Sequence, residues 1–209
     1  MNDATPVVFV VDDDASVRRA LTRVIRSAGY RVEAFESARE FLSRAHADDC
    51  AACLLLDVEL PDLNGLELQR ELNAMSAPVS VIFISGHGDI AMTVSAMKAG
   101  ALDFLVKPVG DTALLSAIEN ALRHASETRA NRIEIDSIRD RLERLTPRER
   151  EVLALVVEGH LNKQVACKLG TAEKTIKVHR ARVMDKMGAH SLAELVRIND
   201  KAGLHRPQS

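Results

Sequence analysis

Aromatic side chains are scarce in this sequence. It has no tryptophan, one tyrosine and five phenylalanines among 209 residues. This scarcity argues against an aromatic cage for a cationic ligand and against a platform on which nucleic-acid bases stack. No apolar run approaches the roughly 20 residues of a membrane span. The N-terminus lacks the basic flank and cleavage site of an export signal, so we expect a cytoplasmic protein with no membrane association.

Cysteine is also rare, with Cys50, Cys53 and Cys167 as the three examples. Cys50 and Cys53 form a CAAC motif, and reactive motifs of this kind lie at a helix N-terminus. Here the motif leads into an apolar, strand-like run, and no second cysteine–histidine cluster is present to complete a metal site. We therefore interpret these residues as unreactive thiols in a reducing compartment.

Charge is divided unevenly along the chain. Residues 1–125 contain 11 basic and 18 acidic side chains, a net charge of −7, whereas residues 126–209 contain 17 basic and 12 acidic ones, a net charge of +5. The length favours two domains over one. An acidic half joined to a basic half indicates different partners for each, and nucleic acid is the usual partner of a basic domain.

The first half alternates strand-like and helix-like segments. The strand-like runs are PVVFVV, YRVEAF, CLLL, VSVIFIS and DFLV, and each is followed by residues with helical apolar spacing. Five such units predict a five-stranded parallel sheet with helices on both faces, a doubly wound α/β fold. Ligands of such sheets bind beyond the carboxyl ends of the strands.

The amino-acid composition changes after residue 124. Residues 125–144 lack glycine and proline, are rich in charge, and predict a helical linker that continues the preceding helix. Its apolar residues are spaced 3-4-3 as Ile135, Ile138, Leu142 and Leu145. They form either a seam for a partner helix or part of a solvated spacer that packs on a neighbouring domain, and both interpretations stay open.

Residues 145–206 predict a small all-α domain. Thr146 and Glu149 form a capping box with Pro147 at the first helical position, and three further short helices follow.

Polar side chains follow four of the five predicted strands. These are Asp12 and Asp13 (with Asp14 as a further candidate), Asp57, Ser85 and Lys107. Three carboxylates in one crevice cannot all remain ionised without a cation, and oxygen ligands alone favour Mg²⁺ or Mn²⁺. Lys107 and the Ser85 hydroxyl would then contact a second anionic group, so the pocket suits a phosphoryl group on Asp57. A single strand-end aspartate is usually a helix cap, but the ordered set is far more specific.

The segments VVDDD, LLLDVELPDLNG, FISGHGD and AMKAGALDFLVKP resemble the receiver domain of bacterial two-component response regulators, which we place at residues 1–124. The resemblance implies that Asp57 is the phosphoacceptor and that Ser85 and Lys107 contact the phosphoryl group. It further implies a switch role for Ser85 and Phe104 and a cis Lys107–Pro108 bond. The implied ligands of the metal ion are Asp12, Asp13, Asp57 and the backbone carbonyl of Glu59. Val109 departs from the family pattern, in which an aromatic residue often follows Lys-Pro.

A basic segment follows, with the sequence NKQVACKLGTAEKTIKVHRARVMDKM. It has seven basic and two acidic residues between positions 162 and 186, and its pattern predicts a helix-turn-helix. At 100° per residue, Ile176, Val183 and Met187 face the core. Arg180 also lies on the core side, where we expect it to pair with an acid such as Glu149, and His179 is expected to be structural. The predicted DNA-binding residues are Lys163, Lys174, Thr175, Lys177, Val178, Ala181 and Arg182.

Together with LTPREREVLALVVEG and SLAELVR, this segment resembles the LuxR-type DNA-binding domain of FixJ- and NarL-like response regulators. The resemblance implies a transcription regulator activated by phosphorylation. A sensor histidine kinase would phosphorylate Asp57 and promote homodimerisation. The dimer would bind double-stranded promoter DNA at an approximate inverted repeat, and RNA polymerase is a further candidate partner.

Two other classes of protein share part of this pattern. A phosphatase of the haloacid dehalogenase type also combines a strand-one aspartate, a hydroxyl, a lysine and Mg²⁺. That fold needs a further acidic pair on a strand after the lysine, whereas here the chain becomes helical and basic after Lys107. The complete pocket also disfavours a receiver used only for protein docking. We therefore expect no enzymatic activity beyond the protein's own phosphoryl transfer to Asp57.

Overall fold

The computed structural model describes residues 5–44, 50–75, 77–86 and 89–203. The chain divides into two compact units, Met1–Ala130 and Asn131–Ser209. Residues 87–88 of the FISGHGD motif and residues 204–206 of the predicted C-terminal domain lie outside the described residues. No helix among the described residues is long and apolar enough to cross a membrane.

The first unit contains a five-stranded sheet in which all strands are parallel, in the order β2-β1-β3-β4-β5. The strands are β1 (Val7–Val11), β2 (Arg31–Phe35), β3 (Ala52–Asp57), β4 (Val79–Ser85) and β5 (Asp103–Val106). The helices that alternate with them are α1 (Ala15–Ser27), α2 (Ala38–Arg44), α3 (Gly65–Ala74), α4 (Ile90–Lys98) and α5 (Asp111–Glu143). The predicted doubly wound fold is confirmed.

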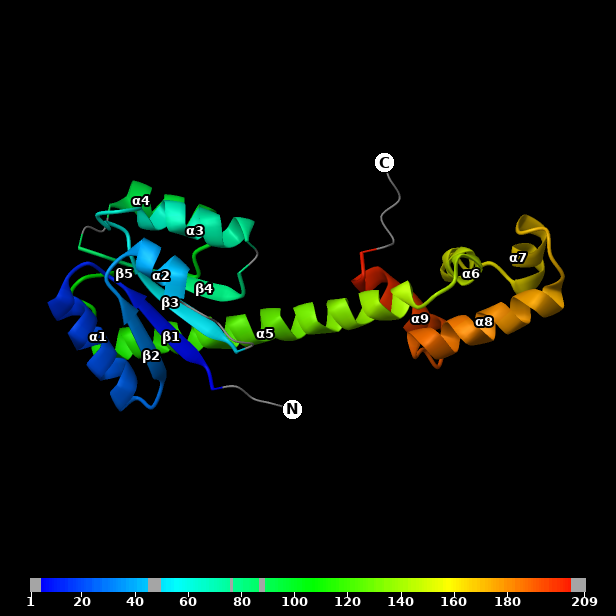
Figure 1. Cartoon of the computed structure of the whole chain (residues 1–209), viewed down its shortest axis with the longest axis horizontal. Helices are drawn as coiled ribbons and strands as arrows, with labels where there is room; N and C mark the ends of the chain where they lie inside the picture. The colour runs from blue at the N-terminus through cyan, green and yellow to red at the C-terminus, as the bar shows by residue number, and fades with distance from the viewer. Residues whose placement is uncertain (1–4, 45–49, 76, 87–88, 204–209) are drawn as a thin grey trace. The chain divides into compact units, whose positions relative to one another are not determined.

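Both faces of the sheet are covered, which explains why the central strands are continuous apolar runs. Helices α2, α3 and α4 cover one face of the sheet, and α1 and α5 cover the other (Figure 1). Phe9 of β1 belongs to the core on the first face, whereas Val8 and Val10 belong to the core on the second. The edge strand β2 is less enclosed, and its buried residues Val32 and Phe35 are separated by more exposed ones. The sequence pattern of each strand therefore follows its position in the sheet.

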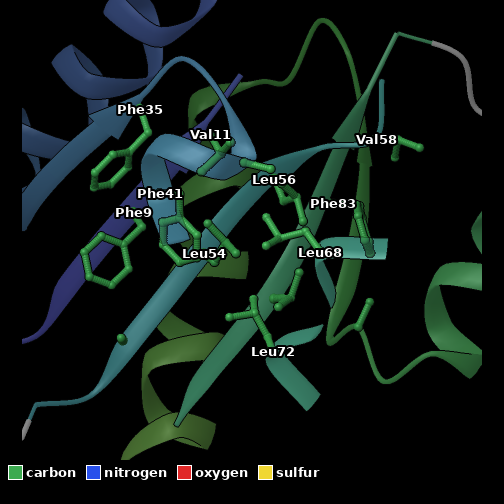
Figure 2. Packing of buried hydrophobic residues seen from close by; sticks show 14 of the residues in the cluster. Phe9, Val11, Phe35, Phe41, Leu54, Leu56, Val58, Leu68, Leu72 and Phe83 are labelled. Carbon is green, nitrogen blue, oxygen red and sulfur yellow. The ribbon is translucent and has the colours of Figure 1, made fainter. Parts of the chain in front are cut away.

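The core on the α2–α3–α4 side contains most of the few aromatic residues (Figure 2). Phe41 of α2 packs edge-on against Phe9 and Phe35, with ring centroids 5.5 Å apart in both pairs. Leu68 and Leu72 of α3 complete the layer. Aromatic residues thus serve the core of this protein, and Cys50 and Cys53 are buried, unbridged thiols as expected.

A glycine sets the approach of α3 to the end of β3. A Cβ atom on Gly65 would lie 2.4 Å from the carbonyl oxygen of Asp57 and 3.1 Å from the Phe83 ring. Gly65 also donates its backbone N–H to the carbonyl of Val58 at 3.0 Å. Only glycine fits this approach, which explains the glycine at the end of LPDLNG and fixes the backbone that carries Asp57.

The second unit is helical, with α6 (Pro147–Val157), α7 (Asn162–Lys168), α8 (Glu173–Met187) and α9 (Leu192–Lys201). The capping box of Thr146 and Glu149 starts α6 as predicted. The predicted linker is the C-terminal part of α5. Ile138 and Leu142 of this part, and Leu145 just after it, pack into the core of the second unit. For these residues the structure supports the spacer interpretation, in which they pack on the domain that follows; Ile135 lies outside this core.

Candidate functional site

The carboxyl ends of four parallel strands bring the predicted pocket residues together. Asp12 follows β1, Asp57 ends β3, Ser85 ends β4 and Lys107 follows β5. Asp12, Asp57 and Ser85 are buried, whereas Lys107 is partly exposed. The pocket therefore combines residues that are up to 95 positions apart in the sequence.

Lys107 joins two of the carboxylates. Its Nζ donates to Oδ2 of Asp12 at 2.7 Å and to Oδ2 of Asp57 at 2.5 Å. Burial raises the pKa of Asp12, and the hydrogen bond from Lys107 offsets this only in part. Burial alone would lower the pKa of Lys107, but the hydrogen bonds to the two carboxylates raise it. Lys107 is therefore held in its charged form beside Asp57.

Three carboxylates lie close enough to share one metal ion. Asp12, Asp13 and Asp57 each place an oxygen atom within 4.8 Å of those of the other two. An all-oxygen set of this kind, with Asp13 exposed to solvent, fits Mg²⁺, which keeps part of its hydration shell. Asp14 is directed elsewhere, because its carboxylate accepts from the backbone of Ser16 and caps α1.

Of the two remaining predicted residues, Glu59 contacts this cluster and Phe104 packs against a core residue of the neighbouring strand. The backbone N–H of Glu59 donates to Oδ1 of Asp57 at 3.0 Å, while the Glu59 side chain is exposed. Phe104 on β5 is half-buried, and its ring centroid lies 6.3 Å from that of Phe83. The Lys107–Pro108 bond is cis, as the resemblance implied.

Arg18 is a pocket residue that sequence reasoning missed. Its Nη1 donates to the backbone carbonyl of Asp12 at 2.7 Å, which ties the first turns of α1 to the loop that carries the acids. The only sequence signal is its place one helical turn after the acidic run, and this signal does not distinguish it from Arg19.

The predicted DNA-binding residues lie on one helix pair in the second unit. Ile176, Val183 and Met187 of α8 are buried, which confirms the core face predicted from the helical wheel. All seven predicted contact residues are exposed: Lys163, Lys174, Thr175, Lys177, Val178, Ala181 and Arg182. A solvent-facing basic surface on the second helix of a helix-turn-helix can enter a major groove of DNA.

The expected partner of Arg180 is wrong. Arg180 donates to Oδ1 of Asn162 at 3.1 Å and so links α8 to the start of α7. Glu149 instead accepts from Nζ of Lys186 at 2.7 Å. This hydrogen bond, together with the one from the Thr146 backbone, lowers the pKa of Glu149 to about 2. His179 is half-buried, and its Nδ1 makes no hydrogen bond within the described part of the chain.

The recognition-helix candidate is held at its C-terminus by the end of α5. Arg141 donates to the backbone carbonyl of Met187, the last residue of α8, at 3.0 Å. Gly188 follows in a left-handed conformation, and a Cβ there would lie 3.1 Å from Arg141 Nη1. Sequence reasoning missed Arg141, because a charge in a polar linker gives no sign of which helix it will meet.

Comparison with protein families assigns both units. Residues 8–119 match the response regulator receiver domain. Residues 143–199 match the bacterial regulatory proteins of the luxR family.

The chain is similar to several curated regulators along nearly its whole length. Nodulation protein W of Bradyrhizobium diazoefficiens is 48% identical, over 95% of this chain and 87% of its own. The transcriptional regulatory protein FixJ of Rhizobium meliloti is 43% identical, over 95% of this chain and 96% of its own. Among solved structures, the response regulator StyR superimposes with a TM-score of 0.83 at 47% identity, covering 95% of this chain and 100% of StyR.

Proposed function

The chain belongs to the two-component response regulators that carry a LuxR-type DNA-binding domain, and we propose that Asp57 is the residue through which it is switched. In this proposal a sensor histidine kinase donates a phosphoryl group to Asp57, and the phosphorylated protein binds promoter DNA in the cytoplasm. The protein transfers this group only to itself and catalyses no other reaction.

The observation that carries the proposal is the hydrogen bond from Lys107 to Asp57. Asp57 Oδ2 is held by the ammonium group, and Asp57 Oδ1 accepts from the Glu59 backbone. Lys107 thus orients the carboxylate and can neutralise the charge that phosphorylation adds. Asp12, Asp13 and Asp57, with the Glu59 carbonyl, would hold Mg²⁺, which supplies charge neutralisation for phosphoryl transfer when bound.

An apolar surface on α4 and β5 supports dimerisation as the output of the receiver. Ile90, Val94 and Met97 are exposed on α4, and Val106 is exposed at the end of β5. The spacing of the α4 residues places them on one helix face. Clustered exposed apolar residues indicate a protein interface. Phe104 of the same strand contacts the core behind this surface. A rearrangement of Ser85 and Phe104 around the phosphoryl group would repack the surface and favour the dimer.

The basic surface of α8 supports DNA as the target. Lys177 and Val178 lie in the first half of α8, where side chains of a recognition helix meet base edges. A dimer would place two such helices on an approximate inverted repeat. RNA polymerase is a candidate partner of a regulator bound at a promoter.

The direct test is phosphorylation of the full-length protein with acetyl phosphate and Mg²⁺, followed by intact-protein mass spectrometry. We expect one base-labile phosphoryl group in the wild type and none in Asp57→Asn. Labelling of Asp57→Asn to the wild-type level would place the phosphoacceptor elsewhere.

A further inference from the structure

A buried amide on α3 has no role in the proposed function. The side chain of Gln69 is fully enclosed, with 0% of the residue exposed. Neither its Nε2 atom nor its Oε1 atom has a hydrogen-bond partner in the described part of the chain. A buried amide without a partner lowers stability by more than a typical hydrogen bond adds. Stability therefore does not account for a glutamine beside the core residues Leu68 and Leu72 of the same helix.

The Gln69 amide lies beside the end of α4. A Cβ atom on Gly100, which follows α4, would lie 3.9 Å from Nε2 of Gln69 and 3.8 Å from Nδ2 of Asn73. Asn73 lies one helical turn after Gln69 on α3, and its Nδ2 donates to the backbone carbonyl of Ala99 at 2.8 Å. Two amide groups of α3 thus approach the same turn of the chain. One of them binds it, and the other does not.

Helix α4 is loosely attached to the rest of the receiver unit. Ala96 is the one buried residue between Ile90 and Lys98, all of which the structure describes, and an alanine buries little apolar area. A helix with few buried apolar contacts moves at low cost. The hydrogen bond from Asn73 is therefore one of the few contacts that hold the C-terminal end of α4 in its position.

We propose that Gln69 is a positioning residue of the receiver switch, an inference that rests on the proposed phosphorylation of Asp57. With Lys107 bound directly to Asp57, Asn73 holds the end of α4 and the Gln69 amide is unpaired. When the phosphoryl group repacks the surface of α4, the end of this helix moves from Asn73 towards Gln69, whose amide donates to a backbone carbonyl there. The unpaired amide disfavours the first arrangement and the new hydrogen bond favours the second, so Gln69 biases the receiver towards the phosphorylated arrangement.

Two α3 variants with opposite expected effects test this inference. Gln69→Met keeps the length of the side chain and removes the amide, whereas Asn73→Ala removes the donor that holds α4. The full-length proteins are treated with acetyl phosphate and Mg²⁺, phosphoryl uptake is measured by intact-protein mass spectrometry, and the dimer dissociation constant by analytical ultracentrifugation. We expect wild-type uptake in both variants. The dissociation constant should rise at least about tenfold in Gln69→Met and fall about threefold in Asn73→Ala.

Arg70→Ala is the control, because Arg70 is exposed on α3 next to Gln69, and it should leave the dissociation constant unchanged. Urea unfolding in EDTA needs no phosphorylation, and Gln69→Met should unfold at a higher urea concentration than wild type. A midpoint no higher than that of wild type, or dissociation constants that change in the same direction or not at all, would overturn this inference alone. A wild type that takes up no phosphoryl group, or stays monomeric with it, would overturn the proposed switch and this inference with it.

Discussion

The Lys107 ammonium lies 2.5 Å from Oδ2 of Asp57, and it is the cation that separates this carboxylate from the buried Asp12. Removing it in Lys107→Ala takes away the one cation that pairs with both carboxylates among the described residues. We expect a loss of about 3 kcal/mol in the free energy of unfolding in the absence of metal. Added Mg²⁺ should recover part of this loss.

Urea unfolding with EDTA and with Mg²⁺ measures both effects. Lys98→Ala is the matched control, because Lys98 lies in the last turn of α4 and is exposed. We expect it to change stability by less than about 0.5 kcal/mol. Identical unfolding midpoints for Lys107→Ala and wild type in EDTA would show that the ion pairs contribute nothing to the fold.

The exposed carboxylate of Asp13 should contribute directly to metal affinity. Asp57 and Asp12 alone offer too few oxygen ligands for Mg²⁺, so Asp13→Ala should weaken Mg²⁺ binding by at least about tenfold and slow phosphorylation by acetyl phosphate. Calorimetric titration with Mg²⁺ measures the change. Asp14→Asn is the control, because an asparagine preserves the cap of α1. If Asp13→Ala and Asp14→Asn bound Mg²⁺ equally well, the ion would lie elsewhere.

Most of the pocket at the carboxyl ends of the strands could be predicted from the sequence. The end of each strand was visible in the apolar pattern, and the parallel topology brings strand ends to one edge, so Asp12, Asp57 and Lys107 could be grouped from sequence. The sequence could not tell whether Asp14 is a metal ligand or the cap of α1. Adjacent aspartates look alike in the sequence and differ only in the direction of their side chains at the start of α1.

The side-chain contacts between helices of the second unit were harder to predict from the sequence. The wheel of α8 assigned Ile176 and Met187 to the core correctly. It could not tell that Lys186, and not Arg180, would meet Glu149. Helical periodicity fixes which face is inside, but the partner across the contact depends on how α6 and α8 slide and cross.

The pair of Glu149 and Lys186 predicts a pH dependence of stability. The folded pKa of Glu149 is lowered from 4.5 to about 2 by the hydrogen bond from Lys186 and by that from the Thr146 backbone. A lowered carboxylate pKa stabilises the fold above pH 4.5, and this contribution is lost as the pH falls towards 2. Glu149→Gln should therefore lower the free energy of unfolding by about 1–3 kcal/mol at neutral pH, and its difference from wild type should shrink below pH 4.5. Urea unfolding at several pH values tests this. A difference that stays constant down to pH 3 would contradict it.

The apolar surface of α4 should control dimerisation without affecting phosphorylation. Val94 is 44% exposed on α4, so Val94→Lys should fold normally and accept phosphate on Asp57. It should remain monomeric when phosphorylated, because dimerisation would bury the lysine charge. Analytical ultracentrifugation before and after phosphorylation gives the mass. Ile133→Lys changes an equally exposed apolar residue of α5 outside this surface and should dimerise as the wild type does. A phosphorylated wild type that stays monomeric, or a Val94→Lys dimer, would exclude this surface.

Two lysines of the helix-turn-helix should have different roles on DNA. Lys177 is exposed in the first half of α8, and its only ion pair in the described residues is with Glu173 at 3.3 Å. An exposed pair of this kind contributes little to stability. A loss of DNA-binding affinity in Lys177→Ala should therefore reflect lost contacts to DNA. We expect the free energy of binding to weaken by about 1–3 kcal/mol and the sequence preference to relax at one base pair. Glu173→Gln, which breaks the ion pair but keeps Lys177, is the control and should retain sequence preference.

Lys163 is exposed at the start of α7 and is expected to meet a phosphate. Lys163→Ala should weaken binding to specific and scrambled DNA alike, because phosphates carry no sequence information. It should also lower the salt slope by about one ion. Binding isotherms at several salt concentrations, on both DNAs, separate the two roles. If Lys177→Ala lost equal affinity for both DNAs, Lys177 would be a phosphate contact, and base reading would have to come from other exposed residues of α8, such as Val178 or Arg182.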